Sequence, residues 1–148
     1  VIAIANTSVV AAWSCQLRGN IEARVSLDKG LTWQPVVLVT ATNTSAANTH
    51  VSWTNGYLLV VWDTVYDVMG DRDIMFALSK DNGLTWAEVN RLNPHGAMDA
   101  GDDTHPILAS DGNSTLVVAW QAHLTRLNSS TYPPPSDIRL GSCVGSYC

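Results

Sequence analysis

One eight-residue pattern, Ser-x-Asp-x-Gly-x-Thr-Trp, occurs twice in this chain and limits the folds open to it. It spans residues 26–33 (SLDKGLTW) and returns, 53 residues later, at 79–86 (SKDNGLTW). The flanking segments return with it, so the repeated unit is larger than the motif. A period of about 50 residues is typical of stacked supersecondary units, each of which buries its apolar face only against a neighbour.

Three apolar strands that end in tryptophan belong to the same repeat. They span residues 9–13 (VVAAW), 58–62 (LLVVW) and 116–120 (LVVAW). The later two follow the turn signals NG at 55–56 and DGN at 111–113. Another strand follows each of the three, and these strands are led by Ile21, Ile74 and Ile138.

Each unit therefore has up to four short strands. We expect first strands near 1–5, 50–54 and 105–109, second strands near 9–14, 57–63 and 115–121, third strands near 20–26, 73–79 and 137–143, and fourth strands near 33–39 and 86–92. Abundant valine and only two glutamates favour strands over helices. The sequence predicts an all-β propeller segment over 1–148, with antiparallel four-stranded blades at about 1–40 and 48–92 and a partial third blade at about 104–148.

The repeated motif can be explained by the chemistry of a tight turn between the third and fourth strands. A short carboxylate accepts hydrogen bonds from amides of its own turn, and glycine permits a positive φ. The threonine re-enters the strand, and the tryptophan packs against the hairpin. These structural roles fall to Ser26, Asp28, Gly30, Thr32 and Trp33 in the first turn, and to Ser79, Asp81, Gly83, Thr85 and Trp86 in the second.

The order of these motifs resembles the Asp-box, or BNR-repeat, proteins of the sialidase superfamily. Bacterial members carry a Val-Val-x-Trp strand, an Asp-Ile strand, the Ser-x-Asp-x-Gly-x-Thr-Trp box and an Arg-Leu-Asn exit. The matching segments here are 59–62, 73–74, 79–86 and 91–93. The resemblance covers nearly the whole chain and implies a sialidase-like β-propeller, in which the boxes are scaffold elements away from the active site.

Charge and hydropathy exclude two classes of partner. The net charge is −5, and Lys29 and Lys80 are the only lysines, so no basic run could neutralise a nucleic-acid backbone. No stretch reaches the roughly 20 apolar residues that a membrane-spanning helix needs. The chain opens at Val1 without a charged leader segment, and we therefore expect a mature product or an excised segment.

Four glycosylation sequons indicate a secreted, extracellular or cell-surface protein. They begin at Asn6, Asn43, Asn113 and Asn128, and none has proline in its middle position. The cysteines Cys15, Cys143 and Cys148 fit an oxidising compartment, although an odd number leaves one without a partner in the same chain. Their spacing does not match a zinc site.

Any chemistry should lie in the loops at one end of the blades, near 15–19, 41–49, 64–72, 93–104 and 122–136. The resemblance to sialidases directs attention to arginines that could hold a carboxylate, a tyrosine nucleophile and an acid. The candidates for catalysis are Tyr66, Arg72, Asp102 and Asp103. The wider set adds Arg18, Arg126, Asp63, Asp67, Asp71 and Asp99. The constellation is incomplete, and the alternative is that these residues are solvated loop charges.

Metal ions and histidines offer weaker signals at the same end. We expect no cofactor and no metal site. Calcium is the one ion left open, with Asp99, Asp102 and Asp103, or Asp67, Asp71 and Asp73, as oxygen ligands, although neither group follows a known loop spacing. His50 and His105 both follow a threonine, and we expect them to occupy equivalent positions that serve the blades. His95 and His123 lie in the loops, where a general base could act.

Two classes of function follow. The first is a secreted, N-glycosylated structural or glycan-binding protein, because sugars at both ends of the blades would leave little open surface for a substrate cleft. The alternative is a segment of a sialidase-like exo-glycoside hydrolase whose catalytic residues lie largely outside this chain. The expected partners are adjoining blades or further copies of the chain, which would join head to tail through the edge at 138–142 and the apolar residues 1–4 into a larger polymer or filament.

Overall fold

The computed structural model describes residues 1–40, 45–65, 70–93 and 101–123, and the backbone of 136–144. Every regular element in these residues is a β-strand, and no helix is present among them. The strands are β1 (Ile2–Ala5), β2 (Ser8–Cys15), β3 (Asn20–Ser26), β4 (Val37–Leu38), β5 (Ala47–Thr54), β6 (Tyr57–Val65), β7 (Arg72–Ser79), β8 (Asn90–Arg91), β9 (Asp103–Ser110), β10 (Thr115–His123) and β11 (Ser136–Val144).

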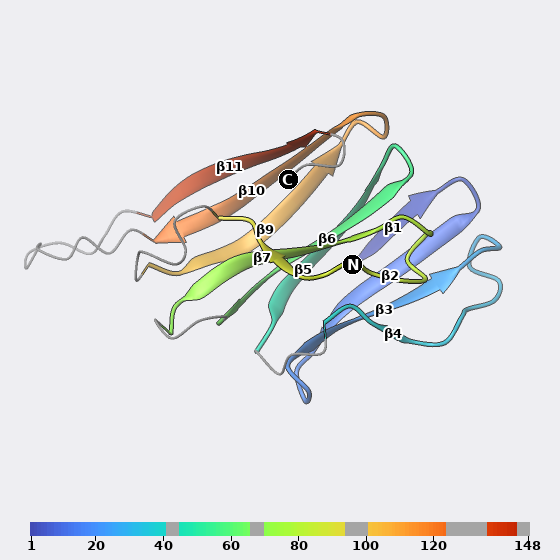
Figure 1. Cartoon of the computed structure of the whole chain (residues 1–148), viewed down its shortest axis with the longest axis horizontal. Helices are drawn as coiled ribbons and strands as arrows, with labels where there is room; N and C mark the ends of the chain where they lie inside the picture. The colour runs from blue at the N-terminus through green and yellow to red at the C-terminus, as the bar shows by residue number, and fades with distance from the viewer. Residues whose placement is uncertain (41–44, 66–69, 94–100, 124–135, 145–148) are drawn as a thin grey trace, which may run out of the picture.

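The strands form three antiparallel sheets, which Figure 1 shows fanning out side by side. The first sheet has the order β1-β2-β3-β4, the second β5-β6-β7-β8, and the third β9-β10-β11. The all-β fold predicted from the repeat is confirmed, with two four-stranded sheets and a third whose described part has three strands.

The fourth strands differ from the prediction because they are much shorter. The spans expected at 33–39 and 86–92 contain only β4 and β8, of two residues each. The chain makes one hydrogen bond to the third strand directly after each repeat turn, from the Gln34 amide to the Val25 carbonyl and from the Ala87 amide to the Leu78 carbonyl. In the first sheet Pro35 follows, and proline has no N–H to donate to the ladder.

The core lies between the sheets, and β6 shows why the middle sheet is apolar throughout. Leu58, Val60 and Trp62 belong to the cluster shared with the first sheet, whereas Leu59 and Val61 belong to the cluster shared with the third. All five are at most 1% exposed. A strand that alternates between two buried faces has no solvent side, so its sequence reads as one apolar run rather than as alternating polar and apolar residues.

The two repeat turns, 26–33 and 79–86, have the same hydrogen bonds. In the first, the Thr32 amide donates to Asp28 Oδ1 at 2.8 Å and the Thr32 hydroxyl donates to Asp28 Oδ2 at 2.6 Å. The Gly30 amide donates to Ser26 Oγ at 2.7 Å. Gly30 and Gly83 have φ angles of +92° and +88°, which glycine adopts without strain.

The hydrogen bonds of the repeat turns also set the ionisation of their aspartates. The side chain and amide of Thr32, together with Ser26, lower the pKa of Asp28 to about 2. Burial raises the pKa of Asp81, but hydrogen bonds from Thr85 and Ser79 outweigh it, and the net pKa lies below the usual value. Both carboxylates are therefore ionised and satisfied within their own turns at neutral pH.

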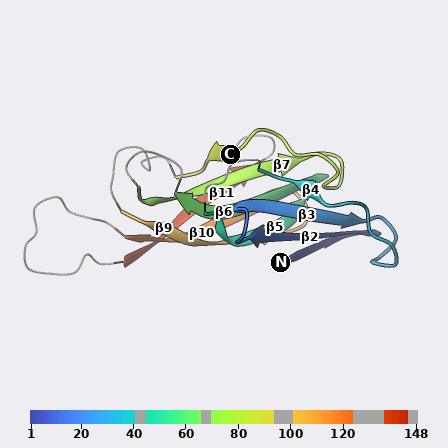
Figure 2. The same ribbon diagram turned by 90° about the horizontal axis from the view of Figure 1, so that it is seen from below.

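The antiparallel order sorts the connections to two ends of the molecule. The hairpin turns β1–β2, β5–β6 and β9–β10 lie at one end with the repeat turns, at the right in Figure 1. The strand ends at Cys15, Val65 and His123 lie at the other, and the edge-on view in Figure 2 shows the strands of all three sheets running between these two ends. Neighbouring sheets contact each other along their first strands, since β5 packs against both β1 and β9.

No helix long and apolar enough to span a membrane occurs in the part of the chain that the structure describes.

Candidate functional site

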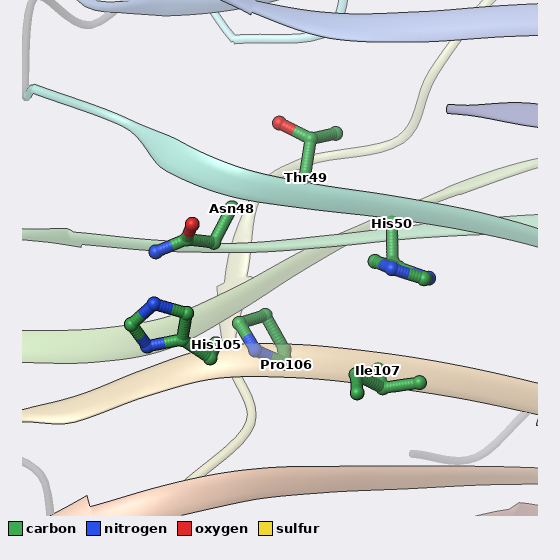
Figure 3. A pocket seen from close by; sticks show the side chains of 6 residues that line it. All are labelled: Asn48, Thr49, His50, His105, Pro106 and Ile107. Carbon is green, nitrogen blue, oxygen red and sulfur yellow. The ribbon is translucent and has the colours of Figure 1, made fainter.

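A groove of about 350 Å³ lies between β5 and β9, the first strands of the second and third sheets. Figure 3 shows Asn48 beside His105 at one end and His50 above Ile107 at the other, with Pro106 between them. The remaining lining residue, Thr49, turns its side chain to the opposite side of β5. The groove lies towards the strand ends where the sequence predicted ligand-binding loops.

Both walls of the groove are formed by irregular strand pairing. The register of β5 against β6 shifts between Ala47 and His50, and the register of β9 against β10 shifts opposite Trp120. Asn48 and His105 sit in these bulges with φ angles of +49° and +56°. β-Bulges redirect side chains, which explains how both residues come to face one groove.

The expected equivalence of His50 and His105 is wrong. His50 pairs with Val61 on β6, and the residue in the matching place on β9 is Ile107, which pairs with Ala119. His105 instead matches Asn48, two residues earlier. Strand register is set by the alternation of buried side chains and by the bulges, and not by the Thr-His pair that the two strands share. His105 is also exposed, so it is not a core residue.

His50 contributes a neutral hydrogen-bonding group to the groove. Burial, followed by the nearby terminal ammonium group of Val1, lowers the pKa of His50. The imidazole of His50 is therefore neutral at pH 7 and offers one donor and one acceptor. Asn48 offers both as well through its carboxamide, while Pro106 and Ile107 supply apolar surface, with Ile107 56% exposed.

A buried ion pair lies directly behind the groove. Asp63 is 0% exposed and accepts a hydrogen bond from Arg72 Nε at 2.6 Å. Nη2 of Arg72 also forms an ion pair with the Asp63 carboxylate. Asp63 also accepts bonds from Asn48 Nδ2 at 2.7 Å and from the His105 amide at 2.9 Å. Arg72 Nη2 donates further to the Ser45 carbonyl at 3.0 Å. The charge of Arg72 is thus committed to Asp63.

A second polar cluster holds the start of β9 against β7. Asn93 Nδ2 donates to Asp73 Oδ1 at 2.9 Å and to Asp103 Oδ2 at 2.7 Å. Arg91 pairs with Asp73 at 3.2 Å. Asp73, Asn93 and Asp103 are buried, at 0%, 3% and 8% exposure, so this cluster tethers strands of two sheets rather than facing a ligand.

The structure brings together three of the four predicted catalytic candidates. Asp102 is exposed and accepts a hydrogen bond from the Arg72 amide at 2.9 Å. Asp103, the next residue, begins β9. Tyr66 lies outside the described residues, as do Asp67, Asp99, His95 and Arg126. Arg18 is elsewhere, on the first sheet, where it pairs with Glu22 at 3.5 Å.

Sequence reasoning missed the lining residues Asn48, Pro106 and Ile107. The available signal for Asn48 was its residue type, because asparagine is enriched among non-glycine residues at positive φ. No comparable signal marked Ile107, whose exposure depends on how two sheets meet.

Other predicted sites are only partly described. Asn6 and Asn113 are exposed at the β1–β2 and β9–β10 turns, and Asn43 and Asn128 lie outside the described residues. Cys15 is a half-buried free thiol at the end of β2, and nothing is described of the Cys143 side chain or of Cys148. Among the described side chains, no three His, Cys, Asp or Glu residues converge on a point where a metal ion could bind.

Three solved enzyme structures have a fold similar to that of this chain. An α-L-arabinofuranosidase from Podospora anserina, crystallised with cellotriose, superposes with a TM-score of 0.61 at 11% identity and covers 99% of this chain. A mutant of the NanB sialidase from Streptococcus pneumoniae has a TM-score of 0.53 at 18% identity over 86% of the chain, and an endo-arabinase from Bacteroides thetaiotaomicron 0.51 at 14% over 88%.

These likenesses define the fold as that of propeller glycosidases. The chain spans 54%, 18% and 50% of the lengths of the three structures. No protein family matches the sequence, and no curated protein matches it either.

Proposed function

We propose that this chain forms part of a carbohydrate-binding β-propeller and that a neutral sugar binds in the groove between β5 and β9. The observation that carries the proposal is the groove itself. It combines Asn48 and His50, which each donate and accept hydrogen bonds, with the apolar surface of Pro106 and Ile107. Sugars present hydroxyl groups of both kinds around apolar C–H faces, and its volume falls within the usual range of ligand sites, about 300–1,000 Å³.

The charges around the groove favour a neutral sugar over a sialic acid. None of its six lining residues is a lysine or an arginine. The guanidinium of Arg72, which lies behind the groove, is paired with Asp63 and bonded to the Ser45 carbonyl. A carboxylate ligand would have to break this pair, which is costly because it would leave Asp63 buried without its cation.

Binding is favoured over hydrolysis by the state of the carboxylates. Glycoside hydrolysis ordinarily needs two carboxyl groups that face the scissile bond. Of the acids near the groove in the described residues, Asp63 and Asp103 are buried and hydrogen-bonded within the protein, and Asp102 alone is exposed. The arabinofuranosidase bound to cellotriose supports a neutral ligand, and the hydrolase alternative requires acids supplied by further blades.

Titration of the purified chain with neutral oligosaccharides, such as cellotriose and arabinotriose, tests this proposal. We expect chemical-shift changes at Asn48, His50 and Ile107 in an NMR titration, and weaker or no changes with sialyllactose. Ile107→Ser should lower the affinity about tenfold, because the contact it removes has a value near 1.4 kcal/mol. Ile2→Ser is the matched control, since Ile2 is 63% exposed on β1, outside the groove.

Two results would overturn the proposed function. One is an equal loss of affinity in Ile107→Ser and Ile2→Ser, which would indicate nonspecific apolar binding. The other is tighter binding of sialyllactose than of any neutral sugar, because the paired Arg72 would then have to be available to a carboxylate.

We further propose that the protein is secreted and carries N-linked glycans. Asn113 supports this because it is exposed in the β9–β10 turn, at the end opposite the groove. In a secretory host, Asn113→Gln should lower the intact mass by that of one glycan, and peptide N-glycosidase should remove the same difference. Asn55→Gln is the control, because Asn55 is exposed in the β5–β6 turn but begins no sequon. An unchanged mass for Asn113→Gln would contradict glycosylation at this site.

We also propose that further blades, from the same polypeptide or from other copies, cover the outer faces of the first and third sheets. Trp13, Trp62 and Trp120 occupy the same position in the three sheets. Trp62 and Trp120 are buried against the preceding sheet, at 1% and 6% exposure, whereas Trp13 is half-buried. The half-buried Trp13 supports an additional blade on that side, as in a larger propeller.

A further inference from the structure

One carboxylate oxygen holds both walls of the groove. Asp63 Oδ2 accepts a hydrogen bond from the Asn48 side chain at 2.7 Å and another from the His105 amide at 2.9 Å. Asn48 and His105 are the bulge residues of β5 and β9, and both have positive φ. The strands that carry them belong to different sheets, so this oxygen links the two blades at the groove.

The other oxygen of the same carboxylate is held by a cation. Arg72 donates from Nε to Asp63 Oδ1 at 2.6 Å and from Nη2 to the Asp63 carbonyl at 3.0 Å. The Arg72 amide in turn donates to Asp102 at 2.9 Å. Because Oδ1 is bonded to Arg72 and the Asp63 side chain is fully buried, the carboxylate has a single orientation, in which Oδ2 points to the groove walls.

The place that Asp63 occupies in the second sheet is not occupied by an acidic residue in the other two sheets. The residue that pairs with the leading isoleucine of the third strand is Ser14 in the first sheet, Asp63 in the second and Gln121 in the third. A carboxylate is therefore not a requirement of the blade repeat. It occurs in the sheet whose first strand forms one wall of the groove.

We propose that Asp63 is a positioning residue for the groove, which sets the distance between its walls by holding Asn48 and His105 to one oxygen. The expected effect of Asp63 on sugar affinity rests on the proposed function. The expected effect of Asp63 on the His105 amide does not depend on any ligand.

Asp63→Asn is the informative substitution because it removes one acceptor and keeps the shape. Asparagine has a single oxygen, and the charge of Arg72 draws that oxygen towards itself. The amide group then faces Asn48 and His105, where it would be a donor opposing donors. Asn48 can rotate its exposed carboxamide to present oxygen, but the backbone N–H of His105 cannot, so the β9 wall is released.

Amide hydrogen exchange measured by NMR tests the proposal directly. In the unaltered protein we expect the His105 amide to be protected, although it lies in a bulge and makes no ladder bond to β10. Asp63→Asn should speed exchange at His105 at least tenfold while amides in the centre of β6 change far less. Where cellotriose binds the unaltered protein, Asp63→Asn should weaken that binding about tenfold.

Two further variants separate positioning from general destabilisation. Asp81→Asn makes the same change at an aspartate that also accepts a backbone amide, that of Thr85 at 2.8 Å, but in the repeat turn at the end of the molecule opposite the groove, and it should leave exchange at His105 unchanged. Asn48→Gly releases only the β5 wall, since glycine tolerates its positive φ, and should keep His105 protected while weakening sugar binding.

The outcomes that would overturn the proposal do not all require the Asp63 variant to fold. Fast exchange at His105 in the unaltered protein would show that Asp63 does not hold this amide. Unchanged exchange in Asp63→Asn, or an equal increase in Asp81→Asn, would overturn it as well. If no sugar binds but His105 follows the expected pattern, the proposed function fails and the positioning role stands.

Discussion

Trp62→Ala should lower the free energy of unfolding by about 3–5 kcal/mol, the usual range for truncating a buried aromatic side chain. Trp62 is 1% exposed and lies in the core cluster between the first and second sheets. Its removal leaves a cavity lined by strands of both sheets, which cannot close without moving one blade against the other. Urea denaturation followed by circular dichroism measures the change.

Trp13→Ala is the control for this prediction, because Trp13 occupies the same position in the first sheet. It is only half-buried, and its indole N–H donates to Glu22 at 3.2 Å. We expect a loss well below that of Trp62→Ala, because less apolar surface leaves the core. Equal losses for the two variants would contradict the packing of Trp62 between the blades.

Gly83→Ala should destabilise the protein by about 2–5 kcal/mol, from a positive-φ penalty of about 1–2 kcal/mol and an overpacking penalty of about 1–3 kcal/mol. Its φ is +88°, and an added Cβ would lie 3.1 Å from Val25 Cγ2, 3.3 Å from Val10 Cγ2 and 3.3 Å from Leu58 Cδ1. Two of these atoms belong to the first sheet, so the new methyl group would push the blades apart.

Gly30→Ala separates the two penalties. Gly30 occupies the matching place in the first repeat turn with a φ of +92°, but a Cβ there would meet nothing within 4 Å. Only the backbone penalty remains, and we expect a loss of about 1–2 kcal/mol in the same denaturation experiment. A loss in Gly30→Ala as large as that in Gly83→Ala would show that the contact with the first sheet does not matter.

The repeat in the sequence predicts most of the fold because it records local interactions. The serine and aspartate of each repeat turn bond to amides and hydroxyls within four residues of themselves. The two-residue turn at 55–56 is also local, because it depends on the positive φ angles of Asn55 and Gly56. Interactions this short in sequence depend on residue type and spacing alone, so both turns and strands could be placed without the structure.

The fourth strands and the histidines show where the same reasoning fails. The repeat suggested long fourth strands, but the regular ladder with the third strand contains only two residue pairs in each sheet. Aligning the two Thr-His pairs suggested equivalent histidines, but the bulges of β5 and β9 place Asn48 opposite His105 instead. A bulge inserts one residue without leaving a clear mark in the pattern of apolar side chains.

What the sequence by itself determined is the chain of strands and turns, its all-β class and the acidic character of the strand ends. What only the tertiary structure decided is the groove. Asp63 reaches the amide of His105 across 42 residues and from one sheet to the next, and no spacing in the sequence predicts that contact. Its physical reason is that the blades meet through β5 and β9, whose relative position is set by the packing of the apolar faces behind them.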